Sequence, residues 1–167
     1  MRWIWTLLTA VGMLSSLPGF ESRALERTGD YLQIGVPAAA GIASLALRDW
    51  PGFRQFAAVM LVSQAATHLL KHTIQSTRPD GGRNGFPSAH TASAFAGSGF
   101  VAFRYGNRYA WPLHAAALVT GYSRITARKH GVVDVLGGAA ISLVSCWGLV
   151  RRRPRSADRG ASARSKD

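Results

Sequence analysis

Acidic residues, and charged residues in general, are scarce in this sequence. Only 17% of its 167 residues are charged, and it has 8 Asp and Glu against 20 Lys and Arg, a formal net charge of +12. Soluble globular domains are about 25% charged, so the composition argues against this class of protein. Hydrophobic residues make up 47% of the chain, and its length fits a single domain.

Cysteine is nearly absent as well. The one thiol, Cys146, lies in an apolar run. A single cysteine excludes a disulfide within the chain and a zinc site built from cysteine ligands. We therefore interpret Cys146 as a small buried side chain.

The basic residues are concentrated at the end of the chain. Residues 151–166 contain seven of the twenty Lys and Arg. A basic tail on an apolar body is typical of a cytoplasmic membrane anchor. The mixture of aromatic and basic residues found in nucleic-acid-binding modules is missing, so we expect no nucleic-acid partner. The predicted organisation is one transmembrane domain over 1–150 and a disordered basic cytoplasmic tail over 151–167.

Long uncharged stretches recur along the body of the chain. They are each 15 to 20 residues long, somewhat short of the about 20 residues that cross a bilayer, and flanking Lys and Arg side chains that reach the interface reduce this deficit. Small residues within them suit close helix contact in lipid. The predicted fold is all-α, a bundle of about six transmembrane helices over 3–20, 31–47, 55–70, 84–103, 109–123 and 135–150.

The positive charges also predict an orientation. Six spans place both termini on one side, and with the termini in the cytoplasm twelve cations lie inside and eight outside. This excess follows the positive-inside rule. Tryptophans are expected at a membrane interface, and all five then fall near the inner one, namely Trp3, Trp5, Trp50, Trp111 and Trp147.

The first segment leaves two interpretations open. Residues 1–20 have a basic start and an apolar middle, which fits either a retained first helix or a cleaved signal peptide. No clean small-x-small cleavage site follows, which favours the retained helix. Residues 21–30, ESRALERTGD, are then interpreted as an outer loop or an interfacial helix.

Two cationic loops are predicted on the outer side. Residues 71–90 connect the third and fourth spans, and residues 123–134 connect the fifth and sixth. Lys71, Arg78 and Arg124 would converge there with backbone amides. Such a set of donors is suited to an anion, and phosphate fits best because Arg binds it bidentately and Lys adds a mobile charge.

Two histidines add possible chemistry to this anion site. His130 and Asp134 are four residues apart, so on a helix they would share a face. A carboxylate that accepts from one imidazole nitrogen leaves the other free as a nucleophile or base. His90, at the start of the fourth span, could protonate a leaving oxygen. Each element alone also fits a structural hydrogen bond or lipid-headgroup contact, and their joint occurrence on one side favours phosphoryl transfer.

Three motifs resemble those of the type 2 phosphatidic acid phosphatase superfamily. KHTIQSTRP at 71–79 matches its K-x6-R-P motif, PSAH at 87–90 is similar to P-S-G-H, and SRITARKHGVVD at 123–134 fits S-R-x5-H-x3-D. The motifs occur in the family's order. The span pattern resembles the six-helix lipid-phosphatase branch of the family.

The resemblance implies a role for each motif residue. His130 would become a phosphohistidine, Asp134 would orient it, and His90 would protonate the leaving group and then activate water. Residues that would hold the phosphoryl oxygens are Lys71, Arg78, Ser88, Arg124 and the backbone N–H of Ala89. This alanine replaces the family's glycine, and a positive φ there would be costly. No metal or cofactor is implied, since the cations neutralise the phosphate.

The predicted function is hydrolysis of a lipid phosphate within the bilayer. The implied location is a bacterial inner membrane, with the active site facing the periplasm or outside. Phosphatidic acid, phosphatidylglycerol phosphate, polyprenyl diphosphate and lipid A phosphates all suit such a site. The alternatives are a soluble-type acid phosphatase or vanadate-dependent haloperoxidase of the same superfamily, and a non-catalytic lipid-binding membrane protein. The sequence does not fix the oligomeric state.

Overall fold

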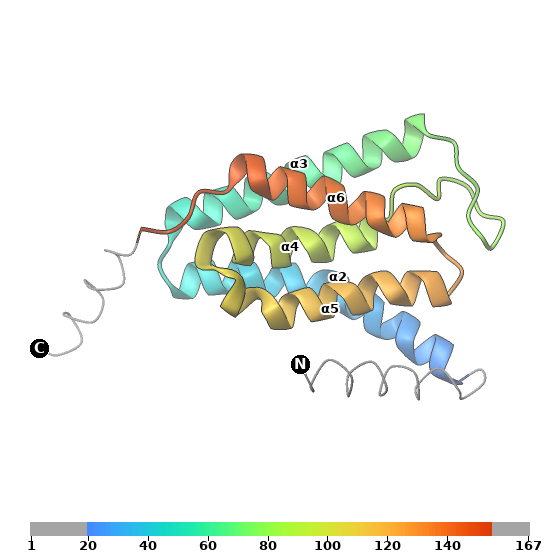
Figure 1. The fold of residues 1–167 in the computed structure, drawn as a ribbon, viewed down its shortest axis with the longest axis horizontal. Helices are drawn as coiled ribbons and strands as arrows, with labels where there is room; N and C mark the ends of the chain where they lie inside the picture. The colour runs from blue at the N-terminus through green and yellow to red at the C-terminus, as the bar shows by residue number, and fades with distance from the viewer. Residues whose placement is uncertain (1–19, 155–167) are drawn as a thin grey trace, which may run out of the picture.

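The computed structural model describes residues 20–154 of the chain, and this part forms a bundle of five helices (Figure 1). Within these residues there is no β-strand, only an isolated bridge between Thr77 and Arg83. The helices are α2 (Phe20–Ala46), α3 (Trp50–Thr73), α4 (Ala89–Tyr105), α5 (Asn107–Thr126) and α6 (Val132–Leu149).

The helices agree with the all-α prediction, and each overlaps one predicted span, although α2 begins well before the predicted span 31–47. The predicted first span, 3–20, and most of the basic tail lie outside the described residues. Between residues 20 and 154, only α6 (Val132–Leu149) is both long and apolar enough to meet the usual criterion for a bilayer crossing. The count of six transmembrane helices is therefore not established by the structure.

Helix α4 forms the centre of the bundle and packs against each of the other four helices. Its sequence, AHTASAFAGSGFVAFRY, is rich in small residues, and Ala92, Ala94 and Ala96 are fully buried. Small side chains allow neighbouring backbones to approach closely. A glycine does the same at Gly97, where an added Cβ would lie 2.6 Å from Cα of Pro37 in α2.

Many small polar side chains are buried inside this bundle, and many large apolar ones are exposed on its outside. Nine Ser and Thr side chains of the described residues are fully buried, namely Ser44, Ser63, Thr67, Ser88, Thr91, Ser98, Thr120, Ser123 and Ser142. By contrast, Leu61 is 72% exposed and Val133 is 71% exposed. Exposed apolar surface on this scale is unfavourable in water but expected where helices contact lipid.

The two ends of the bundle differ. The loops 74–88 and 127–131 both lie at one end, here called the loop end, whereas the α2–α3 and α4–α5 connections lie at the other (Figure 1). The prediction that both cationic loops share a side is thus confirmed. Trp50, Trp111 and Trp147 lie at or near the helix termini of the opposite end and are all exposed.

A buried ion pair closes the opposite end. Arg104 donates to both carboxylate oxygens of Asp49, with Nε–Oδ2 at 2.7 Å and Nη2–Oδ1 at 2.6 Å. The same guanidinium donates to the carbonyl of Arg151, and the Arg153 N–H donates to the carbonyl of Arg104. The packed body therefore extends a few residues past the predicted domain boundary at 150.

Candidate active site

The connection from α3 to α4 folds over the loop end and is held by Lys71. Its Nζ donates to the carbonyl of Asn84 at 2.9 Å. Asn84 has a φ of 57°, in the left-handed region that asparagine tolerates better than most residues. This contact leaves two of the three ammonium protons of Lys71 for a ligand.

Arg78 lies in the same loop and has an unpaired donor. Its Nε is buried and has no hydrogen-bond partner among the described residues. A buried donor left unpaired is costly unless a ligand or water completes it. Nearby, the salt bridge between Lys129 and Asp80, 3.3 Å from Nζ to Oδ2, joins the two loops.

His130 is oriented by a backbone carbonyl. Its Nδ1 donates to the carbonyl oxygen of Gly85 at 2.8 Å, whereas Oδ2 of Asp134 lies 3.6 Å from the same nitrogen. That carboxylate oxygen instead accepts from the Gly131 N–H at 2.8 Å. His130 and Asp134 therefore lie within ion-pair distance, but the hydrogen bond predicted between them goes to Gly85 instead. They do not share a helix face, because α6 begins at Val132 and His130 precedes it.

The surroundings of His130 keep it neutral. Burial, reinforced by the positive charge of Lys71, lowers its pKa to about 4. Arg78 acts in the same direction, while the Gly85 hydrogen bond and Asp134 oppose it. Since Nδ1 carries the proton that it donates to Gly85, Nε2 retains a lone pair. The arrangement is that of a nucleophilic imidazole beside two fixed cations.

The N-terminus of α4 completes the cationic surroundings. Ser88 is the N-cap, and its fully buried hydroxyl accepts a hydrogen bond from the Thr91 hydroxyl at 3.1 Å. The backbone N–H of Ser88 donates to the carbonyl of Asp134 at 2.9 Å. Ala89 is the first residue of α4 and has no positive φ. The alanine therefore costs nothing in backbone strain, and the first amides of the helix can bind an anion.

His90 and Arg124 both contact Asp30, a residue outside the three motifs that was not predicted as part of the site. Oδ1 of Asp30 lies 3.2 Å from Nε2 of His90 and 2.8 Å from Nη1 of Arg124. Arg124 is buried and also donates through Nη2 to the carbonyl of Glu26 at 2.5 Å. Asp30 belongs to the ESRALERTGD segment, which is neither a loop nor a separate interfacial helix but the first turns of α2.

The predicted site residues thus lie together at the loop end. Lys71 acts electrostatically on both His90 and His130, and Arg78 acts on His130. Asp134 and Ser88 are joined by their backbones, and Arg124 reaches His90 through Asp30. Residues 20–154 contain no group of three or more His, Cys, Asp or Glu that could bind a metal ion.

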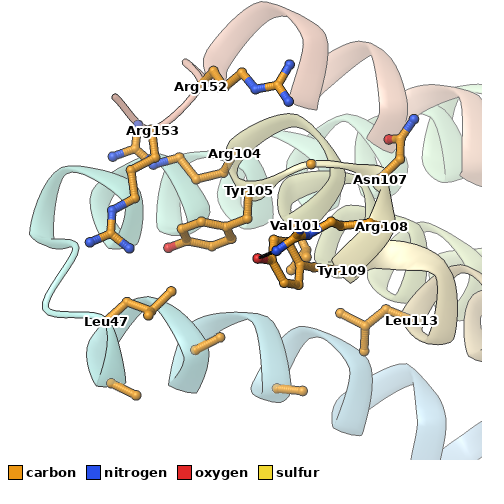
Figure 2. Close-up of a pocket in the computed structure, with 14 residues that line it drawn as sticks. Leu47, Val101, Arg104, Tyr105, Asn107, Arg108, Tyr109, Leu113, Arg152 and Arg153 are labelled. Carbon is orange, nitrogen blue, oxygen red and sulfur yellow. Dashed lines mark hydrogen bonds between the residues drawn. The ribbon is translucent and has the colours of Figure 1, made fainter. Parts of the chain in front are cut away.

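A separate cavity of about 930 Å³ lies at the opposite end (Figure 2). Its walls come from α2, α4, α5 and the residues after α6, and they include Leu47, Val101, Tyr105, Leu113 and Arg152. None of the predicted site residues lines it. The candidate active site is therefore the polar cluster at the loop end, which is independent of this cavity.

The sequence is similar to those of several bacterial phosphatases. It is 36% identical over 157 residues to a lipid A 4′-phosphatase from Helicobacter pylori. This match covers 86% of this chain and 77% of the relative. It is 38% identical over 73 residues to the undecaprenyl-diphosphatase BcrC of Bacillus subtilis, covering 44% of this chain and 37% of that one.

The fold has a solved counterpart in the crystal structure of Aquifex aeolicus LpxE. The TM-score is 0.68, the identity is 18%, and the match covers 84% of this chain and 92% of the other. Residues 52–158 match the PAP2 superfamily, and this range includes all three motifs. With this match and the 36% identity to a relative that is covered over 77% of its length, the chain belongs to the PAP2 superfamily.

Proposed function

We propose that this protein is an integral-membrane phosphatase that hydrolyses a lipid phosphate through a phosphohistidine at His130. The observation that carries the proposal is the state of His130, whose Nδ1 is bonded to Gly85 while Lys71 and Arg78 lie nearby. A neutral imidazole with a free Nε2 beside two cations is suited to attack on a phosphorus atom.

The reaction has two steps. In the first, Nε2 of His130 forms a bond to phosphorus, the bond from phosphorus to the lipid oxygen breaks, and His90 gives that oxygen a proton. In the second, His90 takes a proton from water, the water oxygen attacks phosphorus, and the bond from phosphorus to nitrogen breaks. Free phosphate and the original enzyme result.

The charge that develops on the phosphoryl oxygens is met by fixed donors. Lys71, Arg78 and Arg124 are the cations of the site, and the first amides of α4, including that of Ala89, add N–H groups. Ser88 acts as the helix cap that presents these amides. Asp134 stabilises His130 electrostatically and caps α6 through the Gly131 N–H.

The distribution of side chains supports a placement in the membrane. Apolar residues cover the outside of the bundle, and the loop end carries the polar cluster. We propose that the loop end faces the periplasm or outside of a bacterial inner membrane, that 1–150 and the few residues packed against them form one transmembrane domain, and that the basic residues from 151 on face the cytoplasm. The substrate's acyl or prenyl chains would stay in the bilayer.

The names of the relatives point to lipid A phosphates and undecaprenyl diphosphate as the first substrates to test. The H. pylori lipid A 4′-phosphatase matches over most of both chains, so a phosphate monoester on a lipid A type glycolipid is the leading candidate. The catalytic cluster itself binds only the phosphoryl group. Discrimination between lipids must therefore come from groups that contact the rest of the headgroup.

The test is phosphate release in detergent, with EDTA present, from lipid A, undecaprenyl diphosphate, phosphatidic acid and phosphatidylglycerol phosphate. We expect His130→Ala to lower kcat by at least ~10³-fold, because the covalent step is lost. His90→Ala should lower it by about 10²- to 10⁴-fold. Arg128→Asn is the matched control, since Arg128 is an exposed motif neighbour whose φ of 56° asparagine accepts.

Two results would contradict the proposal. Full activity of His130→Ala would exclude this residue as the nucleophile, and loss of activity with EDTA would contradict catalysis by side-chain cations. Orientation is tested by labelling a cysteine placed at Gly82, which lies in the loop-end connection, because the native Cys146 is buried. Labelling from the cytoplasmic side alone would reverse the proposed orientation.

A further inference from the structure

Asp30 joins two residues of the active site from outside all three motifs. One oxygen, Oδ1, contacts Nε2 of His90 at 3.2 Å and Nη1 of Arg124 at 2.8 Å. Its side chain is 45% exposed, whereas that of Arg124 is 4% exposed. The carboxylate thus lies at the edge of the site, between the proposed acid and a buried cation.

The packing of α2 against α5 places Asp30 there. An added Cβ on the preceding residue, Gly29, would lie 1.9 Å from the Ser123 hydroxyl oxygen and 2.9 Å from Nη2 of Arg124. Only a glycine permits this approach. The carbonyl of Glu26, one turn earlier, accepts from the same Nη2 at 2.5 Å, so α2 holds the Arg124 guanidinium from two directions.

The packing of α2 against α4 fixes the other contact. Pro37 has no N–H, so the carbonyl of Gln33, four residues earlier, lacks its usual helical partner. The Ser93 hydroxyl donates to this carbonyl at 2.7 Å. Ser93 is three residues after His90 and Gln33 is three residues after Asp30. The two helices are therefore linked at successive turns, and the contact between Asp30 and His90 is part of a fixed register.

We propose that Asp30 is the positioning residue for His90 in both proton transfers. This inference rests on the proposed function. By holding Nε2, the carboxylate fixes the ring and leaves Nδ1 as the nitrogen that gives a proton to the leaving oxygen and later takes one from water. Its negative charge also stabilises the imidazolium, which is opposed first by the burial of the ring and then by two cations, Arg124 from α5 and Lys71 from α3.

The role through His90 can be separated from the contact with Arg124 by the leaving group. A lipid alkoxide needs a proton to depart, whereas p-nitrophenolate departs without one. Loss of His90 positioning therefore slows phosphoryl transfer from a lipid phosphate but not from p-nitrophenyl phosphate. Release of the phosphohistidine needs water activation with either substrate. Loss of the contact between Asp30 and the phosphate-binding Arg124 would instead slow phosphoryl transfer from both substrates equally.

The experiment compares Asp30→Asn with the wild type by rapid quench, following the phosphohistidine and released phosphate. We expect kcat on the lipid phosphate to fall about 10- to 100-fold, a part of the 10²–10⁴ that general acid–base catalysis contributes. KM should change by less than about threefold. With p-nitrophenyl phosphate, the phosphohistidine should form at the wild-type rate and accumulate. Arg27→Gln, which removes a charge from the exposed face of α2, should match the wild type.

A double-mutant cycle gives a second measurement. If Asp30 acts through His90, adding Asp30→Asn to His90→Gln should change kcat by less than about twofold. If Asp30→Asn does not fold, Asp30→Glu and the same cycle serve in its place. Equal losses in the rate of phosphohistidine formation from both substrates, full additivity in the cycle, or unchanged activity of Asp30→Asn would each overturn the proposal. Absence of a phosphohistidine in the wild type would instead contradict the proposed function.

Discussion

His130 is held by the carbonyl of Gly85 rather than by the carboxylate of Asp134. The hydrogen bond from Nδ1 to the carbonyl is 2.8 Å, and the carboxylate oxygen lies 3.6 Å from the same nitrogen. The carbonyl fixes the ring and its tautomer. The carboxylate then contributes charge to His130 and a hydrogen bond to the Gly131 N–H.

This division of roles predicts a moderate effect of Asp134→Asn. The amide oxygen can still accept from Gly131, so α6 keeps its cap, while the negative charge beside the forming phosphohistidine is lost. We expect kcat to fall about 10²- to 10³-fold, the size seen when one electrostatic stabiliser is removed. Loss as large as that of His130→Ala would show that the carboxylate, and not Gly85, orients the ring.

The pH dependence should report the pKa of His130. The folded protein lowers this pKa to about 4, so the imidazole stays neutral and nucleophilic until the pH falls through that value. Lys71 is the largest charged contributor to the shift. Lys71→Gln should therefore move the acidic limb of kcat/KM to higher pH, toward the ordinary histidine value of about 6.5.

The measurement is the pH profile of kcat/KM for the two enzymes on one substrate. The substrate phosphate itself has a pKa of about 6, but it titrates identically with both enzymes. The difference between the profiles therefore belongs to the protein. Arg128→Asn, at an exposed position, should leave the limb in place. An acidic limb that does not move in Lys71→Gln would contradict the electrostatic role of Lys71.

The grouping of the motif residues could be predicted from the sequence because it depends on local features. Lys71 and Arg78 flank the start of one loop, and Arg124 and His130 flank another. Once the apolar spans between them are counted, both loops must emerge on one side. The spacing did not reveal which atom holds His130, since a backbone carbonyl such as that of Gly85 has no signature in the sequence.

The role of Asp30 could not be read from the sequence because its contacts are distant, 60 residues away at His90 and 94 at Arg124. The charged residues at the start of α2 also led to the prediction of a loop or an interfacial helix there. The signal that was available is a helical stripe through Leu25, Gly29, Leu32, Val36 and Ala40, in which Gly29, Val36 and Ala40 are buried. This stripe extends the helix through the charged segment and places Asp30 beside its buried face.

Gly29→Ala should disturb the contact between α2 and α5. The new Cβ would meet the Ser123 hydroxyl at 1.9 Å, and Ser123 is fully buried and has little room to move. Overpacking of this kind costs about 1–3 kcal/mol of unfolding free energy. Activity should fall as well, because Asp30 and Arg124 would be displaced. Chemical denaturation in detergent and the lipid-phosphatase assay measure the two effects.

A matched control for this substitution is available in the same helix. Nothing lies within 4 Å of the position that a Cβ on Gly35 would take. Gly35→Ala should therefore leave activity unchanged and stabilise the helix slightly, since alanine is the better helix former. Equal effects of the two substitutions would show that the space at Gly29 is not what matters.

Asp49→Asn should destabilise the bundle more than any change at the surface. The pair of Asp49 and Arg104 is buried, and the charged form of Asp49 is favoured: burial alone would raise its pKa, but the hydrogen bonds from Arg104 and Gly52 outweigh burial and lower it. Asparagine keeps an oxygen for the Gly52 N–H, so the cap of α3 survives. It leaves the Arg104 guanidinium without its charge partner, a loss of about 3–5 kcal/mol for a buried pair.

The expected observation is a large fall in the unfolding midpoint of Asp49→Asn in detergent. The control is Lys129→Gln, which removes the exposed ion pair between Lys129 and Asp80. This variant should leave the unfolding midpoint nearly unchanged. Because Asp49 lies at the end of the bundle away from His130, the fraction of Asp49→Asn that remains folded should keep its kcat. A midpoint equal to that of Lys129→Gln would show that Arg104 finds another partner when the charge of Asp49 is removed.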